Sequence, residues 1–422
     1  MKNRRRLLVW SAGLLIAGVF LNACSAKRSE FTFETEPRAP LAAQSLSPTR
    51  SPQIAVSAAG TISLLALYTD AGKQRIGFTM SHDGGDNFMP VKAISEEGAG
   101  ISAHGENNPM MVTAGRGVFA LWEQTAVGSS DREIVVARST NEGMSFEKPV
   151  RVNDNKTASF HGFASIAADA KGNVYAVWLD GRESPESPGT FDVYMAHSMD
   201  RGATFAPNVR VARSACPCCR PAVTVGKKGE VFVAWRKVFP GSIRDMVVSV
   251  SKDGGQTFPQ QARVSEDGWQ IEGCPESGAA ITTAGDQLYV AWMTAGKNAH
   301  AQVMLASSSD GDVHFSTARA ISSKVSEPNH PTFAHGPNGL LLLCLQGRGA
   351  SEDGKQWSPA ATFVYDVTRL GVEASPLGNG GKSVSYPSAA VSPTGAVFVA
   401  WTTTDEKKGA SIELLRGAAE GK

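Results

Sequence analysis

Short apolar stretches that end in tryptophan recur along this chain. They occupy residues 118–122, 174–178, 231–235, 288–292 and 397–401. Their β-branched and aromatic residues are typical of buried β-strands. Further apolar segments at 133–137, 192–196 and 246–250 follow three of these stretches and predict the next strand of each unit.

A polar motif follows the predicted strands six times. Its full form is Ser-x-Asp-x-Gly-x-Thr-Phe, and its copies, several of them degenerate, begin at Ser81, Ser139, Ser198, Ser251, Ser308 and Ser351. Ser and Asp side chains can bond nearby backbone amides, Gly adopts positive φ, and the terminal aromatic can fold onto apolar layers. The motif therefore predicts a stapled hairpin turn, and its spacing is that of a repeat protein.

A second pattern supports the same period. A proline stands eight residues before a glycine at Pro52/Gly60, Pro109/Gly117, Pro221/Gly229, Pro331/Gly339 and Pro387/Gly395, while Ala164/Gly172 and Gly278/Asp286 fill two gaps. Each of these seven units predicts a four-stranded antiparallel sheet. The last unit has three clear strands at most, and residues 30–35 could supply its outer strand and close the ring. We favour seven blades over six. Six blades remain an alternative because the repeat pattern of the sixth unit is degenerate.

The polar motif resembles the Asp-box (BNR) repeats of the sialidase superfamily, where the box joins the third and fourth strands of each propeller blade. The resemblance covers roughly residues 50–416. It implies an all-β fold, a β-propeller of four-stranded antiparallel blades. We assign residues 51–422 to this propeller and residues 24–50 to a tether that contains the ring-closing strand.

Composition narrows the choice of partners. The chain has 422 residues, 42% of them hydrophobic, and a formal net charge of +1 from 41 basic and 40 acidic side chains. No lysine- or arginine-rich run follows the N-terminal segment, so we expect no nucleic-acid partner. No nucleotide or organic cofactor is expected, and a monomer is the expected state.

The N-terminus predicts export. Three arginines at 4–6 precede an apolar run at 7–20, which is typical of a signal peptide over residues 1–23. The segment ending at Cys24 resembles the lipobox of bacterial lipoproteins. The resemblance implies that Cys24 is lipidated and attaches the protein to a membrane. We expect an outer-membrane lipoprotein that faces the periplasm or the cell surface.

Propeller geometry places the residues before each repeat proline, and those after each tryptophan, around one channel mouth. Four cysteines fall there in neighbouring units: Cys216, Cys218, Cys219 and Cys274. Thiolates select soft metals, and because Cys-x-Cys-Cys does not match the standard zinc spacing, Cu(I) is favoured over structural zinc. Side chains that could complete or rim the site are His104, His161, His330 and Met293. Cys344, in an apolar run, is expected to be buried.

A disulfide is the alternative for these cysteines. An exported protein meets an oxidising compartment, and one or two disulfides could tie the two loops together. Because a disulfide between adjacent Cys218 and Cys219 would be strained, Cys274 would have to pair with one of the other three. Thiol redox chemistry is a third possibility.

The resemblance also implies a catalytic set for comparison. Sialidases hold the substrate carboxylate with three arginines, use a tyrosine nucleophile activated by a glutamate, and employ an aspartate as acid/base. The chain offers Tyr386, Asp180 and Glu276 as catalytic candidates, and Arg50, Arg182, Arg220 and Arg236 as substrate-binding candidates. Arg50-Ser51-Pro52 matches the family's Arg-Ile-Pro motif in two of three letters. The set is incomplete, so a sialidase is not the expected function.

Three functions are therefore carried forward. The first is a propeller lipoprotein that binds a soft metal, copper favoured, through the cysteines. The second is an exo-glycosidase of the sialidase type. The third is a non-catalytic propeller that binds a glycan or a protein at the channel mouth, with loops stapled by disulfides.

Overall fold

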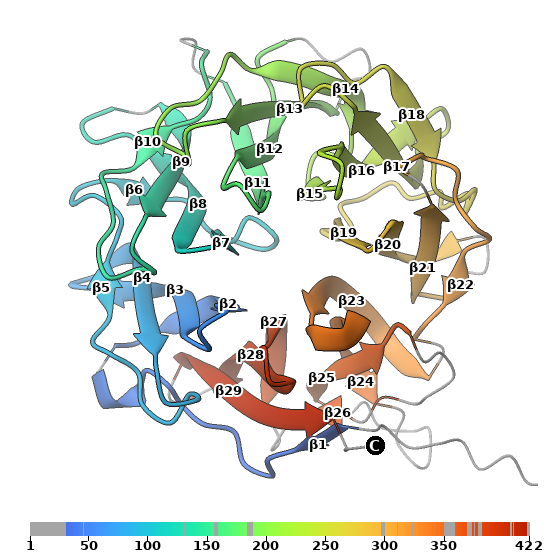
Figure 1. The fold of residues 1–422 in the computed structure, drawn as a ribbon. Helices are drawn as coiled ribbons and strands as arrows, with labels where there is room; N and C mark the ends of the chain where they lie inside the picture. The colour runs from blue at the N-terminus through green and yellow to red at the C-terminus, as the bar shows by residue number, and fades with distance from the viewer. Residues whose placement is uncertain are drawn as a thin grey trace, which may run out of the picture.

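The chain folds into a ring of antiparallel β-sheets around a central axis, as a computed structural model shows (Figure 1). The structure describes residues 31–44, 46–129, 131–155, 159–183, 189–296, 300–309, 311–322, 324–349, 359–368, 374, 376–378, 382–405, 407 and 409–419. The predicted signal peptide, Cys24 and the predicted Asp box at 351–357 lie outside these residues. Within the described part of the chain, no helix is both long and apolar enough to cross a membrane.

The first two sheets contain the N-terminal repeats. The first is built from β2 (Thr49–Val56), β3 (Ile62–Asp70), β4 (Lys73–Ser81) and β5 (Lys92–Ala93). The second contains β6 (Gly100–Ile101), β7 (Met110–Ala114), β8 (Gly117–Thr125), β9 (Arg132–Ser139) and β10 (Val150–Arg151). Both β6 and β7 pair with β8, at opposite ends of that strand.

The middle of the chain forms one eight-stranded sheet. Its strands are β11 (His161–Ala168), β12 (Val174–Asp180), β13 (Phe191–Ser198), β14 (Val209–Ala215), β15 (Ala222–Val225), β16 (Val231–Phe239), β17 (Ile243–Ser251) and β18 (Gln260–Arg263). Three four-stranded sheets follow. The first contains β19 (Ala279–Ala284), β20 (Gln287–Thr294), β21 (Gln302–Ser309) and β22 (Arg319–Ala320), and the second contains β23 (Val325–His335), β24 (Leu341–Gly349), β25 (Ala360–Asp366) and β26 (Pro376–Leu377). The third contains β27 (Ser383–Val391), β28 (Ala396–Asp405), β29 (Gly409–Ala419) and β1 (Phe31–Phe33).

The blade count differs from the prediction of seven or six separate blades. Among the described strands, five sheets stand as separate blades of four or five strands, and the sixth sheet joins two repeat units. The join is a single residue pair between Ala215 of β14 and Lys237 of β16. Sequence repeats do not reveal this join, because it arises where the end of β14 extends toward the next unit.

The last sheet combines the two ends of the described chain. β1 pairs antiparallel with β29, with Phe31 opposite Ala419 and Phe33 opposite Gly417. β1 therefore occupies the outer edge of the sheet formed by β27, β28 and β29 (Figure 1). This is the position to which the sequence assigned residues 30–35.

Five of the predicted Asp boxes lie between third and fourth strands, as the resemblance implied, whereas the sixth, at 351–357, falls between β24 and β25, the second and third strands of their sheet. In the box after β17, Ser251 Oγ donates to Asp253 Oδ1 at 2.6 Å and accepts from the Gly255 N–H at 2.8 Å. Asp253 also accepts from the Thr257 N–H at 2.9 Å and from the Thr257 hydroxyl at 2.6 Å. Gly255 has φ +92°, and Phe258 packs against the apolar core. This box therefore staples one turn and sends one aromatic ring inward.

Tryptophans fill the core, as expected from their place in the second strands. The five at the ends of the apolar stretches are at most 2% exposed, and Cys344 is fully buried. The core clusters cross from one sheet to the next; one of them joins Phe119 of β8 to Trp178 of β12. The innermost strands are thereby held around the central axis, where the candidate site lies.

Candidate functional site

A central cavity of about 380 Å³ lies along the axis of the ring. It is lined by the innermost strands of successive units, among them β2, β7, β11, β15, β19, β23 and β27. Its polar lining includes Glu106, Arg220, His330 and Tyr386. Three of these are predicted mouth residues, whereas Glu106 is not.

A repeated backbone irregularity directs side chains toward this mouth. Ser51, Phe163, His330 and Tyr386 each precede a repeat position, and their φ angles are 55°, 54°, 50° and 51°. The strand pairing shifts register at each of these points. Such a bulge re-aims a side chain that would otherwise follow strict alternation. As a result, the His330 and Tyr386 rings, from β23 and β27, approach to 4.7 Å between centroids.

Glu106 is the buried anion of the cavity. One carboxylate oxygen accepts from the backbone N–H of Gly278 at 2.7 Å and from that of Arg220 at 3.1 Å. The other lies 3.0 Å from Nδ1 of His330. Burial opposes ionisation, but the hydrogen bond and charge of His330, the charge of Arg220 and the Gly278 N–H hold the pKa of Glu106 below its ordinary value. Glu106 thus joins three of the innermost loops.

Tyr386 and Arg220 face the same cavity. Burial, together with the charges of Glu106 and Glu276, raises the pKa of Tyr386 to about 12. Tyr386 is therefore a neutral phenol at pH 7, suited to donate a proton or a hydrogen bond. Burial lowers the pKa of Arg220, against the charge of Glu106, and its Nη1 lies 3.1 Å from Sδ of Met110.

The other predicted arginines do not converge on this cavity. Arg182 donates to both carboxylate oxygens of Asp180 at 2.8 and 3.0 Å and to Asp154 at 2.6 Å. Arg236 is 1% exposed, and its guanidinium donates to the backbone oxygens of Ser277 and Met293 at 2.9 and 2.7 Å. Arg50 lies on β2 beside Gln74. Among the described residues, the four predicted arginines thus do not form a three-arginine carboxylate site.

The acidic candidates have different surroundings. Asp180 is buried and accepts from the Trp178 indole N–H at 2.7 Å, in addition to pairing with Arg182. Glu276 is exposed, has φ +42°, and contributes to the pKa shift of Tyr386. Only Glu276 among the predicted acids therefore accompanies Tyr386.

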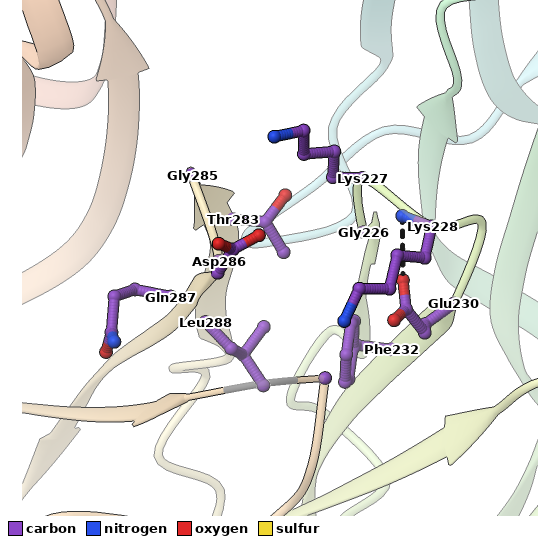
Figure 2. Close-up of a pocket in the computed structure, with 11 residues that line it drawn as sticks. Gly226, Lys227, Lys228, Glu230, Phe232, Thr283, Gly285, Asp286, Gln287 and Leu288 are labelled. Atoms are coloured by element: carbon purple, nitrogen blue, oxygen red, sulfur yellow. Dashed lines mark hydrogen bonds between the residues drawn. The ribbon is translucent and has the colours of Figure 1, made fainter.

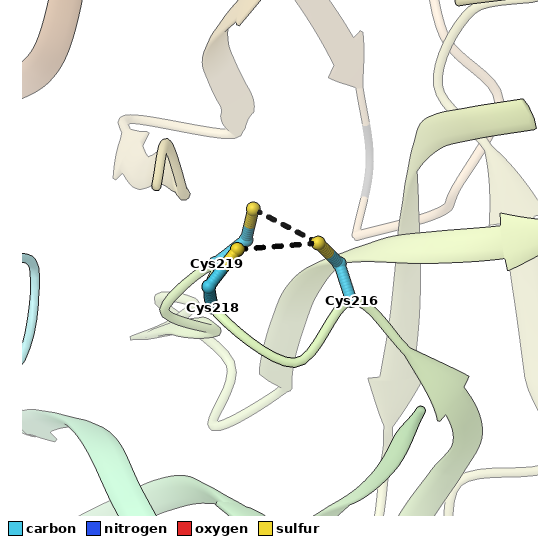
Figure 3. A group of neighbouring side chains, drawn as sticks. All are labelled: Cys216, Cys218 and Cys219. Carbon is cyan, nitrogen blue, oxygen red and sulfur yellow. Dashed lines mark hydrogen bonds between the residues drawn. The ribbon is translucent and has the colours of Figure 1, made fainter. Parts of the chain in front are cut away.

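The four predicted cysteines do come together. Sγ of Cys216 lies 3.8 Å from Sγ of Cys218 and 3.2 Å from Sγ of Cys219 (Figure 3). Cys218 forms a disulfide with Cys274, across 56 residues of sequence. The three sulfurs of the first loop all lie within 4.8 Å of one another. The disulfide predicted as the alternative is thus present, and two thiols remain beside it.

The two thiols have opposite acidities. A hydrogen bond from the Cys219 thiol lowers the pKa of Cys216 to about 6; burial opposes this shift, while the Cys218 N–H and the charges of Arg236 and Arg244 assist it. Arg244 Nη1 also donates to Cys216 Sγ at 3.2 Å. Burial raises the pKa of Cys219, as does its hydrogen bond to Cys216. Cys216 is therefore the thiolate of the pair.

The additional ligands predicted from sequence lie elsewhere. Met293, on β20, packs in a core cluster, and Nδ1 of His330 lies 3.0 Å from the Glu106 carboxylate. His161 is 1% exposed, and its Nε2 lies 3.5 Å from Asp180 Oδ2. His104 rests edge-on against Phe163, with ring centroids 6.0 Å apart. None of them joins the metal-competent group found among the described residues, which consists of cysteines alone.

Sequence reasoning missed three features of the site. Glu106 stands just upstream of Asn107 and Asn108, the two residues that directly precede Pro109. Arg244 lies on β17 and carries no motif. Cys216 and Cys219 form a Cys-x-x-Cys pair, a sequence signal that the overlapping Cys-x-Cys-Cys spacing hides.

A second, smaller pocket lies away from these residues (Figure 2). It has a volume of about 20 Å³ and is formed by the turns that precede β16 and β20. Lys227, Lys228, Glu230 and Asp286 line it, and Glu230 accepts from the Lys228 N–H at 3.1 Å. None of the predicted site residues lines this pocket.

The ring of antiparallel sheets with Asp-box turns defines a β-propeller. The profile of the family described as "BNR repeat-like domain" matches residues 69–399, and the chain belongs to that family. It is a propeller built from BNR repeats. No curated protein matches the sequence.

Solved structures show similar folds at low identity. A protein of unknown function from Dyadobacter fermentans DSM 18053 is 14% identical with a TM-score of 0.52, over 88% of this chain and 94% of that chain. A polysaccharide lyase, PL25 ulvan lyase, is 12% identical with a TM-score of 0.52, over 78% and 84%. The NanB sialidase from Streptococcus pneumoniae is 10% identical with a TM-score of 0.48, over 85% and 84%. At these identities the first two likenesses show the fold alone.

Proposed function

We propose that this protein is an exported propeller lipoprotein that binds a soft metal, with copper favoured, through its cysteine loops. The observation that carries the proposal is the convergence of Cys216, Cys218 and Cys219 within 4.8 Å, with Cys274 bonded to Cys218. Four sulfurs from two adjacent loops can reach one ion. The residues at hand suit a metal that prefers sulfur.

Sulfur spacing supports this proposal. A metal bonded to thiolates at about 2.3 Å separates its ligand sulfurs by about 4 Å. The separations of 3.2 and 3.8 Å from Cys216 require only small side-chain adjustments to meet that value. We assign the Cu(I) ion to all three sulfurs of the first loop, Cys218 included, with Cys274 as a further ligand.

Local charge supports it as well. A Cu(I) ion bound to two or more thiolates carries net negative charge, and burying that charge is costly without cations nearby. Arg244 donates to Cys216 Sγ, and the buried Arg236 has backbone oxygens as its hydrogen-bond acceptors. The charges of both guanidinium groups act on Cys216 and can offset the charge of a thiolate complex.

The disulfide makes the proposed binding conditional. Cys218 and Cys274 can act as thiolate ligands only after their bond is reduced, because the thiolate is the metal ligand. Copper uptake should therefore require a reductant. In the proposed setting, a lipid on Cys24 would hold the propeller at a membrane; Cys24→Ser should release it into the soluble fraction.

The test is copper stoichiometry on the full chain. Protein reduced and handled without oxygen should retain about one Cu(I) per chain after gel filtration. Cys216→Ser and Cys219→Ser should each lower retention strongly, and the oxidised protein should retain little. Cys344→Ala is the matched control, since Cys344 lies in a separate core cluster. Full retention in both serine variants, or no copper in the reduced protein, would overturn the proposal.

A second candidate is a glycan ligand, or an exo-glycosidase reaction, in the central cavity. The specific observation is that Tyr386, Arg220 and Glu106 line one cavity and that Glu276 acts on Tyr386. The scattered positions of Arg182 and Arg236 weigh against a sialidase. Turnover of a fluorogenic sialoside that is lost in Tyr386→Phe would support the enzyme, whereas glycan binding without turnover would support a non-catalytic propeller.

A further inference from the structure

The cysteine loops contain a dithiol next to a disulfide. Cys216 and Cys219 are free thiols whose sulfurs lie 3.2 Å apart, in a Cys-x-x-Cys arrangement. The Cys218–Cys274 disulfide lies beside them, with Cys218 Sγ 3.8 Å from Cys216 Sγ. Both sulfurs that Cys216 could bond to are thus in van der Waals contact with it. A metal-binding role does not by itself require one pair to be oxidised beside another pair that is reduced.

We propose that these four cysteines perform thiol–disulfide exchange, in which the disulfide moves from Cys218–Cys274 to Cys216–Cys219. This activity goes beyond metal binding, because the Cys216 and Cys219 thiols act as a two-electron reductant and no metal ion is needed. The substrate class is a disulfide on another molecule, which receives the two electrons held by the buried pair.

The first step is attack by the Cys216 thiolate on Cys218 Sγ. The bond between Cys216 and Cys218 forms, the Cys218–Cys274 bond breaks, and Cys274 leaves as a thiolate. In the second step Cys219, deprotonated as its proton passes to the Cys274 thiolate, attacks Cys216. The Cys216–Cys219 bond forms, and Cys218 leaves as a thiolate. One disulfide and two thiols are present before and after, so atoms and electrons balance.

The outward step restores the first disulfide. Cys274 passes its proton to the Cys218 thiolate and then attacks an external disulfide, so that a mixed disulfide forms and one external thiolate leaves. That external thiolate takes the proton from Cys218, and the Cys218 thiolate attacks Cys274, which reforms Cys218–Cys274 and releases the second external thiolate. The net result is that two electrons pass from the Cys216 and Cys219 thiols to the external disulfide.

Burial separates the two ends of this relay. Cys216, Cys219 and Cys218 are 0%, 1% and 5% exposed, whereas Cys274 is exposed. Among the four, Cys274 is therefore the one that a second molecule can reach. A direct bond between the adjacent Cys218 and Cys219 is disfavoured by geometry, which leaves Cys216 as the attacking group.

Glu106 keeps the two loops in register for this exchange. Its carboxylate accepts from the N–H of Arg220, directly after Cys219, and from the N–H of Gly278, four residues after Cys274. One buried side chain therefore fixes both cysteine loops to a third unit of the propeller. Glu106 is a positioning residue in this proposal.

Peptide mapping tests the exchange on the full, metal-free chain. Trypsin cleavage after Arg213 and Lys227 releases all three cysteines of the first loop in one peptide, and cleavage after Arg263 and Lys297 releases Cys274 in another. The protein is incubated at neutral pH with a chelator, quenched with acid, alkylated with N-ethylmaleimide and digested. The starting disulfide links the two peptides. The exchanged form yields an internal disulfide in the first peptide and an alkylated Cys274.

Three variants decide the outcome. Wild-type protein should show alkylated Cys274 on the order of tenfold above Cys216→Ser, in which the linked peptides should persist. Cys219→Ser should still free Cys274 and should carry its internal disulfide between Cys216 and Cys218, which isolates the first step. Cys344→Ala should behave like wild type.

Absence of free Cys274 in wild type, or equal amounts in Cys216→Ser, would overturn the relay. Retained copper without exchange would leave the metal proposal standing and remove this one. Exchange in a chain that retains no copper would do the reverse.

Discussion

Removal of the Glu106 carboxylate should destabilise the propeller more than removal of any exposed acid. Glu106→Ala leaves the N–H groups of Arg220 and Gly278 without their acceptor and His330 without its anion. Each buried unsatisfied group costs about 1–3 kcal/mol. Removing the carboxylate also leaves the buried charge of Arg220 without its anion, and breaking a buried charge pair from one side costs about 3–5 kcal/mol in total, so we expect a loss in that range. Glu106→Gln keeps an oxygen acceptor and should lose about 1–3 kcal/mol.

The assay is urea unfolding followed by tryptophan fluorescence, since the core tryptophans are buried. Glu97→Ala is the matched control, because the Glu97 side chain is 90% exposed and lies 3.9 Å from Arg75. It should change stability by less than about 0.5 kcal/mol. The pKa of Glu106 is lowered in the folded protein, so its contribution is complete above about pH 4.3 and is lost as pH falls through the folded pKa. A Glu106→Ala loss no larger than that of Glu97→Ala would refute the reasoning.

Three further predictions concern the scaffold. Trp178→Phe should cost about 1–3 kcal/mol more stability than Trp235→Phe. The Trp178 indole donates to a buried carboxylate at 2.7 Å, whereas the Trp235 Nε1 has no partner among the described residues. Equal losses in thermal unfolding would contradict this. Hydrogen bonds, the largest contribution coming from the Ser251 hydroxyl, lower the pKa of Asp253 to about 2. As pH falls below about 4, the wild type should therefore lose stability more steeply than Asp253→Asn in acid unfolding. Parallel curves would show that the Asp253 carboxylate does not stabilise the turn. Gly143→Ala should cost more than Gly60→Ala, since both have φ near +85° (88° and 85°) but only the first places its Cβ 2.2 Å from a phenylalanine ring; equal denaturation midpoints would show that the ring yields.

The strands were predictable because their signal is local and repeated. The stretches 118–122 and 174–178 fall inside β8 and β12, and the box after β17 closes the turn by bonds within seven residues of sequence. The joined sheet was not predictable, because it depends on how far β14 extends past its own unit. That extension is settled by packing against β16, which no repeat pattern records.

The site was predictable only in part, for the same reason. The cysteine loops precede repeat positions in adjacent units, so their convergence follows from the period of the repeat. Glu106 bonds to residues 114, 172 and 224 positions away, and no local pattern carries such contacts. The choice of partner for Arg182 depends on its rotamer and on the proximity of Asp180, which removed it from the cavity.

The pairing of β1 with β29 also sets an order of events during synthesis. Residues 31–33 are made long before their partners, residues 417–419. Until the ribosome has passed Ala419, β1 has no strand to pair with, and the last sheet stays incomplete. Closing this contact spans nearly the whole described chain, and such distant pairings form late because the loop entropy must be overcome first. The ring therefore becomes a closed object only after residue 419 has been made.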